Sequence, residues 1–370
     1  MGRIEGSKGS STVTLFAIVT VLAIIFLGLS IFVRQAMALE NSAKGRSDRK
    51  AILVEKAHKV MEALEDDDTP ESDCAFDKVW DVVDDDEAIT LTDISSRINP
   101  NDIETGGGFL AFLNETLVKP EKLFTDSYEE SVKEFAQQRT DKGFYVDIKR
   151  GYSKFFDPEV LDTFFTGYSF FNFNVSYSEV LRDMVKLRCD SETDGEEFHK
   201  AYQVYESSEL RVNKTNPEIE DWFQREGLTV KNFDKVFPLI NGDPLWNVHF
   251  MPEELLKAVL EYYETRVSLP KGSKAQKLTG WQVSAENILK QREEFQDGLT
   301  LDALRSIIDH NKTLIHPVSN VYQYLGVYTW FWELVIEEKN SKLRWVITRL
   351  PKLKDTDDFV FKIVEEDYQL

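Results

Sequence analysis

The stretch that decides the fold of this chain is Thr12–Val33, TVTLFAIVTVLAIIFLGLSIFV, which contains 22 residues and no charged side chain. A helix of that length rises about 33 Å, enough to cross the ~30 Å hydrocarbon layer of a bilayer. A cleaved secretory signal is the alternative, because Ala36-Met37-Ala38 imitates a signal-peptidase site, but the apolar region of such signals covers only ~7–15 residues. We therefore predict one membrane span, with the chain after residue 50 outside the lipid.

Basic and acidic residues are divided unevenly along the chain. The 370 residues carry a net charge of -21, yet residues 1–50 hold seven Lys/Arg against three Asp/Glu, and the remaining 320 hold 37 against 62. A chain this acidic repels DNA and RNA, which excludes nucleic acid as a partner. The only cysteines, Cys74 and Cys189, are too few for a disulfide scaffold or a cysteine-ligated metal, and the sequence leaves open whether they pair.

The residues before the span form a short basic leader, Ser7–Val13, in which Gly9 precedes the apolar helix. This arrangement resembles the leader of type IV prepilins and pseudopilins, and the resemblance implies cleavage between Gly9 and Ser10 by a prepilin peptidase. The positive-inside rule opposes this orientation, because two basic residues precede the span and five follow it. The five are Arg34, Lys44, Arg46, Arg49 and Lys50.

Beyond the span the pattern predicts that the helix continues and packs on a domain. Apolar residues recur at helical steps from Ile52 to Leu64, until acidic residues and Pro70 end the pattern. Two strands are then expected, Lys78–Val83 and Ile89–Ile94.

The middle of the chain is mostly helical in pattern and its end is not. Residues 321–337 and 343–350 are rich in Val, Tyr, Trp and Ile and predict an antiparallel hairpin, and the tail after Pro351 is either another strand or mobile. The expected helices are Tyr128–Gln138, Ser178–Leu187, Glu253–Tyr263, Ala285–Phe295 and Leu301–Ile308.

These elements predict an α+β fold in which a long N-terminal transmembrane helix and a small antiparallel sheet are interrupted by a large all-helical insertion. The expected segments are a leader (1–9), a spine helix (10–64), the first part of a pilin-like domain (65–104), the helical insertion (105–317), the closing strands (318–350) and an acidic tail (351–370).

Several segments, in order, resemble the minor pseudopilin K family of the type II secretion system. Asp93–Asn101 is similar to the family's Asp-Glu-x-Gly-Arg-Ile-Asn-Leu-Asn stretch, although Ser96 replaces its glycine. Pro244–Leu260 is similar to its Ile-Asn-Val-Asn-Thr-Ala element with the following helix, although His249-Phe250-Met251 replaces Asn-Thr-Ala. The other matching segments are Leu181–Tyr202, Ser208–Leu210, Arg292–Leu304 and Ser319–Arg349.

The resemblance implies a subunit that caps the tip of a secretion pseudopilus and takes part in protein export across the outer membrane. It implies a single pass through the inner membrane, with most of the chain in the periplasm. The partners would be smaller minor pseudopilins, the major pseudopilin, the inner-membrane secretion platform and the prepilin peptidase. Type IV pilins usually carry a glutamate five residues after the cleavage site, whereas Thr14 occupies that position here.

The most distinctive candidate site is the acidic segment Asp190–Glu197, where carboxylates alternate before a glycine as in calcium loops. The resemblance implies calcium bound by Asp190, Asp194 and Glu197, and the alternation adds Glu192. The alternative is a solvated acidic loop in a chain that is acidic throughout.

Catalytic motifs are absent from the sequence, which has no Gly-x-Ser-x-Gly elbow, phosphate loop, dinucleotide fingerprint or His-Glu-x-x-His. We therefore expect a protein that is not an enzyme. The rival interpretation is a signal-anchored extracytoplasmic binding domain, glycosylated at the sequons Asn114, Asn174, Asn213 and Asn311. A membrane-anchored glycosidase has only the aromatic content in its favour.

Overall fold

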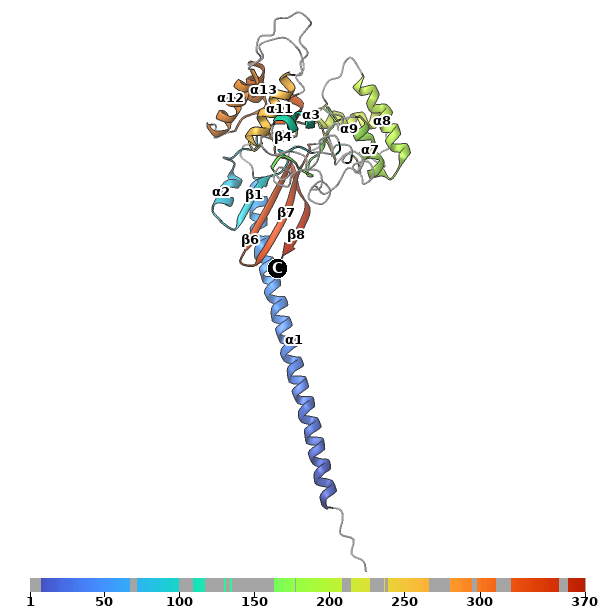
Figure 1. The fold of residues 1–370 in the computed structure, drawn as a ribbon, viewed down its shortest axis with the longest axis vertical. Coiled ribbons are helices and arrows are strands. Elements are labelled where there is room, and N and C mark those ends of the chain that lie inside the picture. Colours follow the sequence, from blue (N-terminus) through green and yellow to red (C-terminus); the bar gives the residue numbers. More distant parts are fainter. Residues whose placement is uncertain are drawn as a thin grey trace, which may run out of the picture.

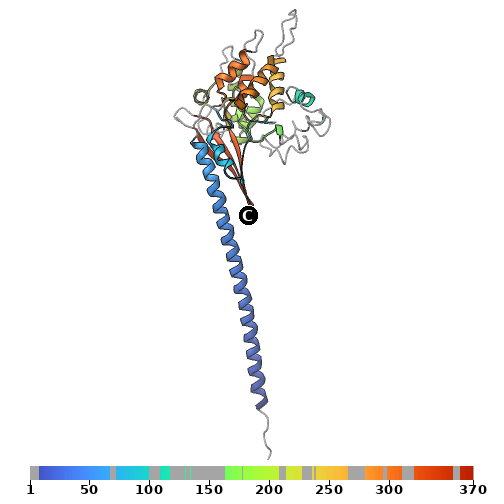
Figure 2. The ribbon, with the colours of Figure 1, turned by 90° about the vertical axis from the view of Figure 1, so that its left-hand side faces the viewer.

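The computed structural model describes residues 8–66, 72–99, 109–116, 163–176, 178–207, 214–226, 239–265, 280–294, 298–310, 321–352 and 359–369, with the single positions 130, 134 and 236. One helix, α1 (Lys8–Glu65), projects far out of a head that contains the remaining elements (Figures 1 and 2). Some of the sequence predictions lie outside these ranges. They are most of the expected leader, the helix expected at Tyr128–Gln138 except residues 130 and 134, and the sequons Asn213 and Asn311.

The two ends of α1 lie in different surroundings. Large apolar side chains from Leu15 to Val33 are exposed on every side of the helix, and this is the one described helix long and apolar enough to cross a membrane. Near the other end Leu53, Ala57 and Val60 are buried at a helical spacing, so only this part packs on the head.

The sheet under this part of α1 is antiparallel, with the order β1 (Ile89–Asp93), β6 (Phe331–Glu338), β7 (Ser341–Leu350) and β8 (Val360–Gln369). Alternate residues of β6 and β7, such as Trp332 and Trp345, face α1 and form the core between the helix and the sheet. The predicted strand Ile89–Ile94 and the hairpin are confirmed, and the tail forms a fourth strand.

Two strand predictions were wrong. Lys78–Val83 belongs to a short helix, α2 (Lys78–Asp84). This helix buries Val79, and its Trp80 contacts Trp332 of the sheet. The apolar residues therefore form one face of a helix, although several of them are β-branched. The strand expected over residues 321–337 begins only at Phe331, because a helical turn, α14 (Val321–Tyr324), and a short strand, β5 (Leu325–Gly326), come before it.

β1 and β6 are hydrogen-bonded neighbours although most of the head lies between them in sequence. Asp93 pairs with Trp332 in the ladder, and the N–H of Ile94 donates to the carbonyl of Phe331 at 3.0 Å. The helical block is therefore one long connection between two adjacent strands, and it lies beyond the sheet at the end away from the free end of α1 (Figure 1).

This connection returns on itself through short parallel pairings. Ile98 pairs with Phe165, β2 (Phe171–Asn172) with β3 (Ile240–Asn241), and β4 (Trp246–Asn247) with β5. The second pairing encloses helices α7 (Ser178–Cys189), α8 (Glu192–Glu206) and α9 (Asn216–Arg225), and the third encloses α11 (Glu253–Thr265), α12 (Gly280–Glu294), α13 (Leu301–His310) and α14. The expected helices at 178–187, 253–263, 285–295 and 301–308 are confirmed within these units.

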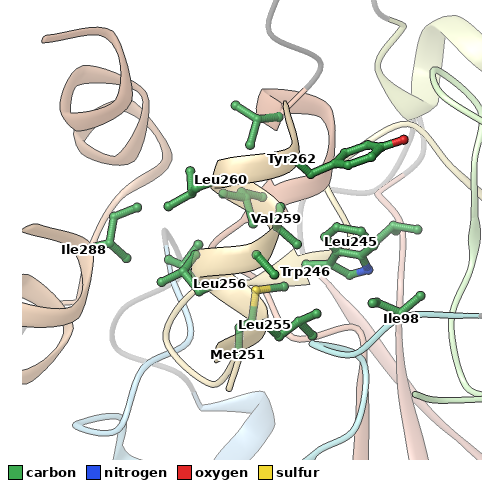
Figure 3. Packing of buried hydrophobic residues seen from close by; sticks show 14 of the residues in the cluster. Ile98, Leu245, Trp246, Met251, Leu255, Leu256, Val259, Leu260, Tyr262 and Ile288 are labelled. Carbon is green, nitrogen blue, oxygen red and sulfur yellow. The ribbon is translucent and has the colours of Figure 1, made fainter. Parts of the chain in front are cut away.

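The two units have separate apolar cores. Aromatic side chains dominate the first, where Phe173 meets Tyr202 and Trp222 edge to face. The second forms around α11 and also takes in Ile98, Phe165 and α3 (Phe109–Thr116). Figure 3 shows Leu256 and Leu260 on the side of α11 that faces Ile288 of α12.

Candidate functional site

The residues expected at the processing site and in the membrane all belong to α1. Gly9 and Ser10 lie in its first turn, which begins at Lys8, and Thr12 and Thr14 follow in the same helix. The expected cleavage point therefore falls in the first turn of the helix. Val33, near the end of the apolar run, is exposed.

Between the apolar run and the head lies a mainly polar part of the same helix, residues 34–50. Its residues with described burial are exposed except for Gly45, which is half-buried, and the basic residues that follow the span are among the exposed ones. At 1.5 Å per residue this length separates the end of the apolar run from the head by about 25 Å. The head is thus held away from the exposed apolar part of α1.

The acidic segment is mostly helical and is only briefly a loop. Asp190 adopts a left-handed conformation (φ 51°), Ser191 caps α8 by accepting from the N–H of Asp194 at 3.2 Å, and Glu192–Glu197 form the first turns of α8. The Nζ of Lys186 on α7 pairs with Glu192 at 2.6 Å and with Glu196 at 3.0 Å. Hydrogen bonding to these carboxylates raises the pKa of Lys186.

The glycine of this segment has a packing role. A Cβ at Gly195 would lie 2.2 Å from Cγ of Lys186 and 3.0 Å from the carbonyl oxygen of Arg182, so only glycine lets α8 approach α7 this closely. Among the described residues no three His, Cys, Asp or Glu side chains are placed to hold a metal ion. Calcium binding by Asp190, Glu192, Asp194 and Glu197 stays a prediction, and it would require Glu192 to leave Lys186.

Among the described residues, several buried polar groups lie close together where the sheet meets the helical block. We call Asp73, Asp93, Asn247, Thr329 and Arg349 the buried junction; each is at most 6% exposed. Asp93, at the end of β1, accepts hydrogen bonds from the N–H groups of Ser95 (2.7 Å) and Ser96 (2.9 Å). It also accepts from the hydroxyls of Ser95, Ser96 and Thr329. Burial raises the pKa of Asp93 although five donors surround its carboxylate.

The second carboxylate of the junction is neutralised by an arginine. Asp73 lies in the segment between α1 and α2, and Arg349 lies near the end of β7; their side chains form an ion pair in which each is 3% exposed. Asp73 also accepts the N–H of Thr329 at 2.5 Å. The guanidinium of Arg349 lies over the rings of Phe359 (4.6 Å) and Phe361 (5.2 Å), so the pair ties the start of β8 to the segment after α1.

Asn247 of β4 attaches the helical block to this pair. Its side-chain amide donates to the carbonyl of Asp73 (2.9 Å) and to Oγ1 of Thr329 (3.0 Å), and its N–H donates to Oγ of Ser96 (3.1 Å). Its Oδ1 accepts the N–H of His249 at 3.0 Å. Nε2 of His249 accepts the N–H of Leu299 at 2.9 Å, and burial lowers the pKa of His249 to about 4.

Sequence reasoning missed the asparagines that close the units. In each of three places an Asn Oδ1 accepts the N–H two residues later: Asn172 from Asn174, Asn241 from Asp243, and Asn247 from His249. The sequence did contain a signal, a recurring four-residue pattern of an apolar residue, Asn, any residue and a polar residue. The pattern occurs at Phe171–Asn174, Ile240–Asp243 and Trp246–His249.

Two open sequence questions receive structural answers. Cys74 and Cys189 are not joined by a disulfide, and both are buried. The side chain of Asn174 is 1% exposed and donates to the carbonyls of Lys214 and Gly242, which is incompatible with a glycan on the folded chain at that sequon.

Comparison of the chain with models of protein families, with curated proteins and with solved structures finds no match in any of the three.

Proposed function

We propose that this chain is a minor pseudopilin that caps the tip of a short secretion pseudopilus and takes part in protein export across the outer membrane. The observation that carries the proposal is α1, whose first part is apolar and exposed on every side while its last turns pack by one apolar stripe on a small antiparallel sheet. A membrane subunit that later enters a helical filament needs both parts in one helix.

The bulk of the head supports a position at the tip. A rod packed through parallel N-terminal helices raises successive subunits by ~10 Å or less, and a single helix is already ~10–12 Å wide. The units enclosing α7–α9 and α11–α14 add two helical cores to the sheet. Subunits of this size would collide along a shaft, whereas the end of a filament leaves them room.

Thr14 fits the same position. A carboxylate in lipid is costly unless it is paired, and in a filament its partner is the amino terminus of the subunit above. A subunit at the tip has no neighbour above and gains nothing from that glutamate. Its expected partners are smaller minor pseudopilins, the major pseudopilin and the inner-membrane platform, reached from a single span with the head in the periplasm.

The deciding experiment is intact mass spectrometry of the membrane-extracted protein. The proposal expects a chain that starts at Ser10 with a methylated amino terminus. Retention of Met1 would contradict it and favour a plain signal anchor. A start near Glu40 would instead indicate a cleaved signal peptide.

Calcium binding at the start of α8 belongs to the same proposal. The carboxylates of Asp190, Glu192, Asp194 and Glu197 would supply the oxygen ligands that this ion prefers. Its support is the sequence pattern and the exposure of three of the four side chains, those of Asp190, Glu192 and Glu197.

A further inference from the structure

Among the strands that the structure describes, β8 forms a long outer edge of the sheet, with no further strand beside it. β8 extends over ten residues, pairs with β7 on one side and is the last strand in the sheet order. An edge strand presents alternate N–H and C=O groups that have no partner in the sheet, and a strand of another chain can use them. Val360 is 51% exposed and Val364 48% exposed, so apolar surface accompanies this edge.

The two faces of β8 differ in chemistry. The register with β7 places Ile363 beside Ile347 and Tyr368 beside Leu343, so both lie on the face toward α1, where they are half-buried members of the core under that helix. The opposite face carries Glu365, beside Val346, Asp367, beside Arg344, and Lys362, beside Thr348. Glu366, beside Trp345, is exposed and lies on the same face as Ile363 and Tyr368. An edge that only repels other strands would be polar on both faces, whereas here Ile363 and Tyr368 continue the core on one face, with Glu366 between them.

The charges of the other face restrict the occupant. Glu365 is held by Arg344 at 2.5 Å and by the hydroxyl of Tyr168 at 2.5 Å, while Asp367 is exposed. A second copy of this chain would bring the same three carboxylates, those of Glu365, Glu366 and Asp367, against one lysine, Lys362, together with a net charge of -21. Like charges opposite each other across two strands are destabilising, so self-pairing is disfavoured.

We propose that the free edge of β8 binds an extended segment of a different protein, in which apolar residues alternate with Lys or Arg. The apolar side chains would extend the row of Ile363 and Tyr368, and the basic ones would face Glu365 and Asp367. Backbone hydrogen bonds would supply affinity, and the alternation would supply specificity. The inference goes beyond the proposed function, because it uses only the sheet and applies to any anchored form of the chain.

The test uses the full chain in nanodiscs of zwitterionic lipid and a blocked synthetic peptide in which valine alternates with lysine. Hydrogen exchange of β8 amides should slow by at least about tenfold at saturating peptide, because outward N–H groups gain partners. The same peptide with N-methyl groups at alternate positions keeps the charge but cannot pair, and should give no protection. A peptide with glutamate in place of lysine should not bind.

Matched charge reversals locate the site. Asp367→Lys should weaken binding of the lysine peptide by about tenfold. Asp84→Lys, at the exposed end of α2, makes the same change in net charge and should leave binding unchanged. Asp367 is exposed, so the reversal should not prevent folding.

Equal protection by the N-methylated peptide, binding without protection of β8, or no binding at all would each overturn the proposal and leave β8 as a guarded edge. None of these outcomes bears on the mature amino terminus, so failure here is distinguishable from failure of the proposed function.

Discussion

The buried junction and the acidic segment at the start of α8 contain the same kinds of side chain in opposite environments. Asp73 is 3% exposed in its ion pair with Arg349, whereas Glu192 is 83% exposed in its pair with Lys186. In the junction each carboxylate joins segments that are far apart in sequence, Asp73 through Arg349 and Asp93 through Thr329, while at α8 the carboxylates of Asp190, Glu192 and Glu197 are exposed. Acidic residues in this chain therefore have two roles, and burial distinguishes them: buried carboxylates join segments of the fold, and exposed ones are free to meet solvent or ions.

The largest effect should follow from removing the cation of the junction. Arg349→Met leaves the carboxylate of Asp73 buried without its counter-charge, and breaking a buried pair in this way costs about 3–5 kcal/mol of unfolding free energy. Thermal unfolding of the full chain in detergent, followed by tryptophan circular dichroism, measures it. The control Lys342→Met, which removes an exposed ion pair with Glu337, should cost at most about 1 kcal/mol. Equal losses of stability in the two variants would contradict the expected difference between the buried and the exposed ion pair.

Acid should weaken the junction through His249. Folding lowers its pKa to about 4, against about 6.5 in an unfolded chain, so between these values the unfolded state binds more protons. Stability is complete above pH ~6.5 and is lost as the pH falls toward 4, by at most about 3 kcal/mol. His249→Gln keeps an acceptor for the N–H of Leu299 and should remove this part of the pH dependence. Identical pH profiles for the two proteins would contradict the assignment.

A smaller loss of stability is expected from Asp93→Asn, which keeps the shape of the side chain and removes a hydrogen-bond acceptor. In Asp93→Asn one carboxylate oxygen becomes an NH₂ group. That group faces either backbone N–H groups, which cannot accept, or the hydroxyls of Ser96 and Thr329, which already accept from Asn247. An unsatisfied buried polar group costs about 1–3 kcal/mol of unfolding free energy. Urea unfolding should register this loss. Asp84→Asn, an exposed counterpart, should change stability by no more than about 0.5 kcal/mol. A larger loss of stability from Asp84→Asn than from Asp93→Asn would contradict the expected difference between exposed and buried carboxylates.

The smallest effect is expected at the acidic segment. Asp190→Asn with Asp194→Asn should change the stability of the calcium-free protein by no more than about 0.5 kcal/mol, and asparagine also tolerates the left-handed conformation at 190. If calcium binds there as proposed, it raises the Tm of the parent and leaves that of the variant unchanged. A parent whose Tm ignores both calcium and chelator would mark the segment as a solvated helix start.

The sequence predicted elements that depend on local pattern. An uncharged run and an apolar stripe were enough for α1, and clusters of β-branched and aromatic residues were enough for β6 and β7. The same rule failed at Val79, Val82 and Val83, whose spacing also fits a helical face, because a seven-residue segment takes its conformation from the sheet and helix it contacts.

The junction depends on contacts that no local pattern contains. Asp73 and Arg349 are 276 positions apart, and Asp93 meets Thr329 across 236 positions. For Gly195 the pattern suggested an ion loop, whereas the structure places this residue where two helices touch, because the distance between α7 and α8 is fixed by tertiary packing. What remains a prediction is the identity of the membrane assembly, since neither the sheet nor α1 specifies a partner.

The adjacency of β1 and β6 has an evolutionary consequence. The whole helical block leaves and re-enters the sheet at neighbouring points, and within the block each parallel pairing brings the two ends of a unit side by side. Segments with adjacent ends can be gained, enlarged or lost in a gene without displacing the strands that flank them. Related chains would then differ in length mainly between Asp93 and Phe331 while keeping the sheet and its spine unchanged, and a short ancestor with a simple turn at this place would already have had a complete sheet.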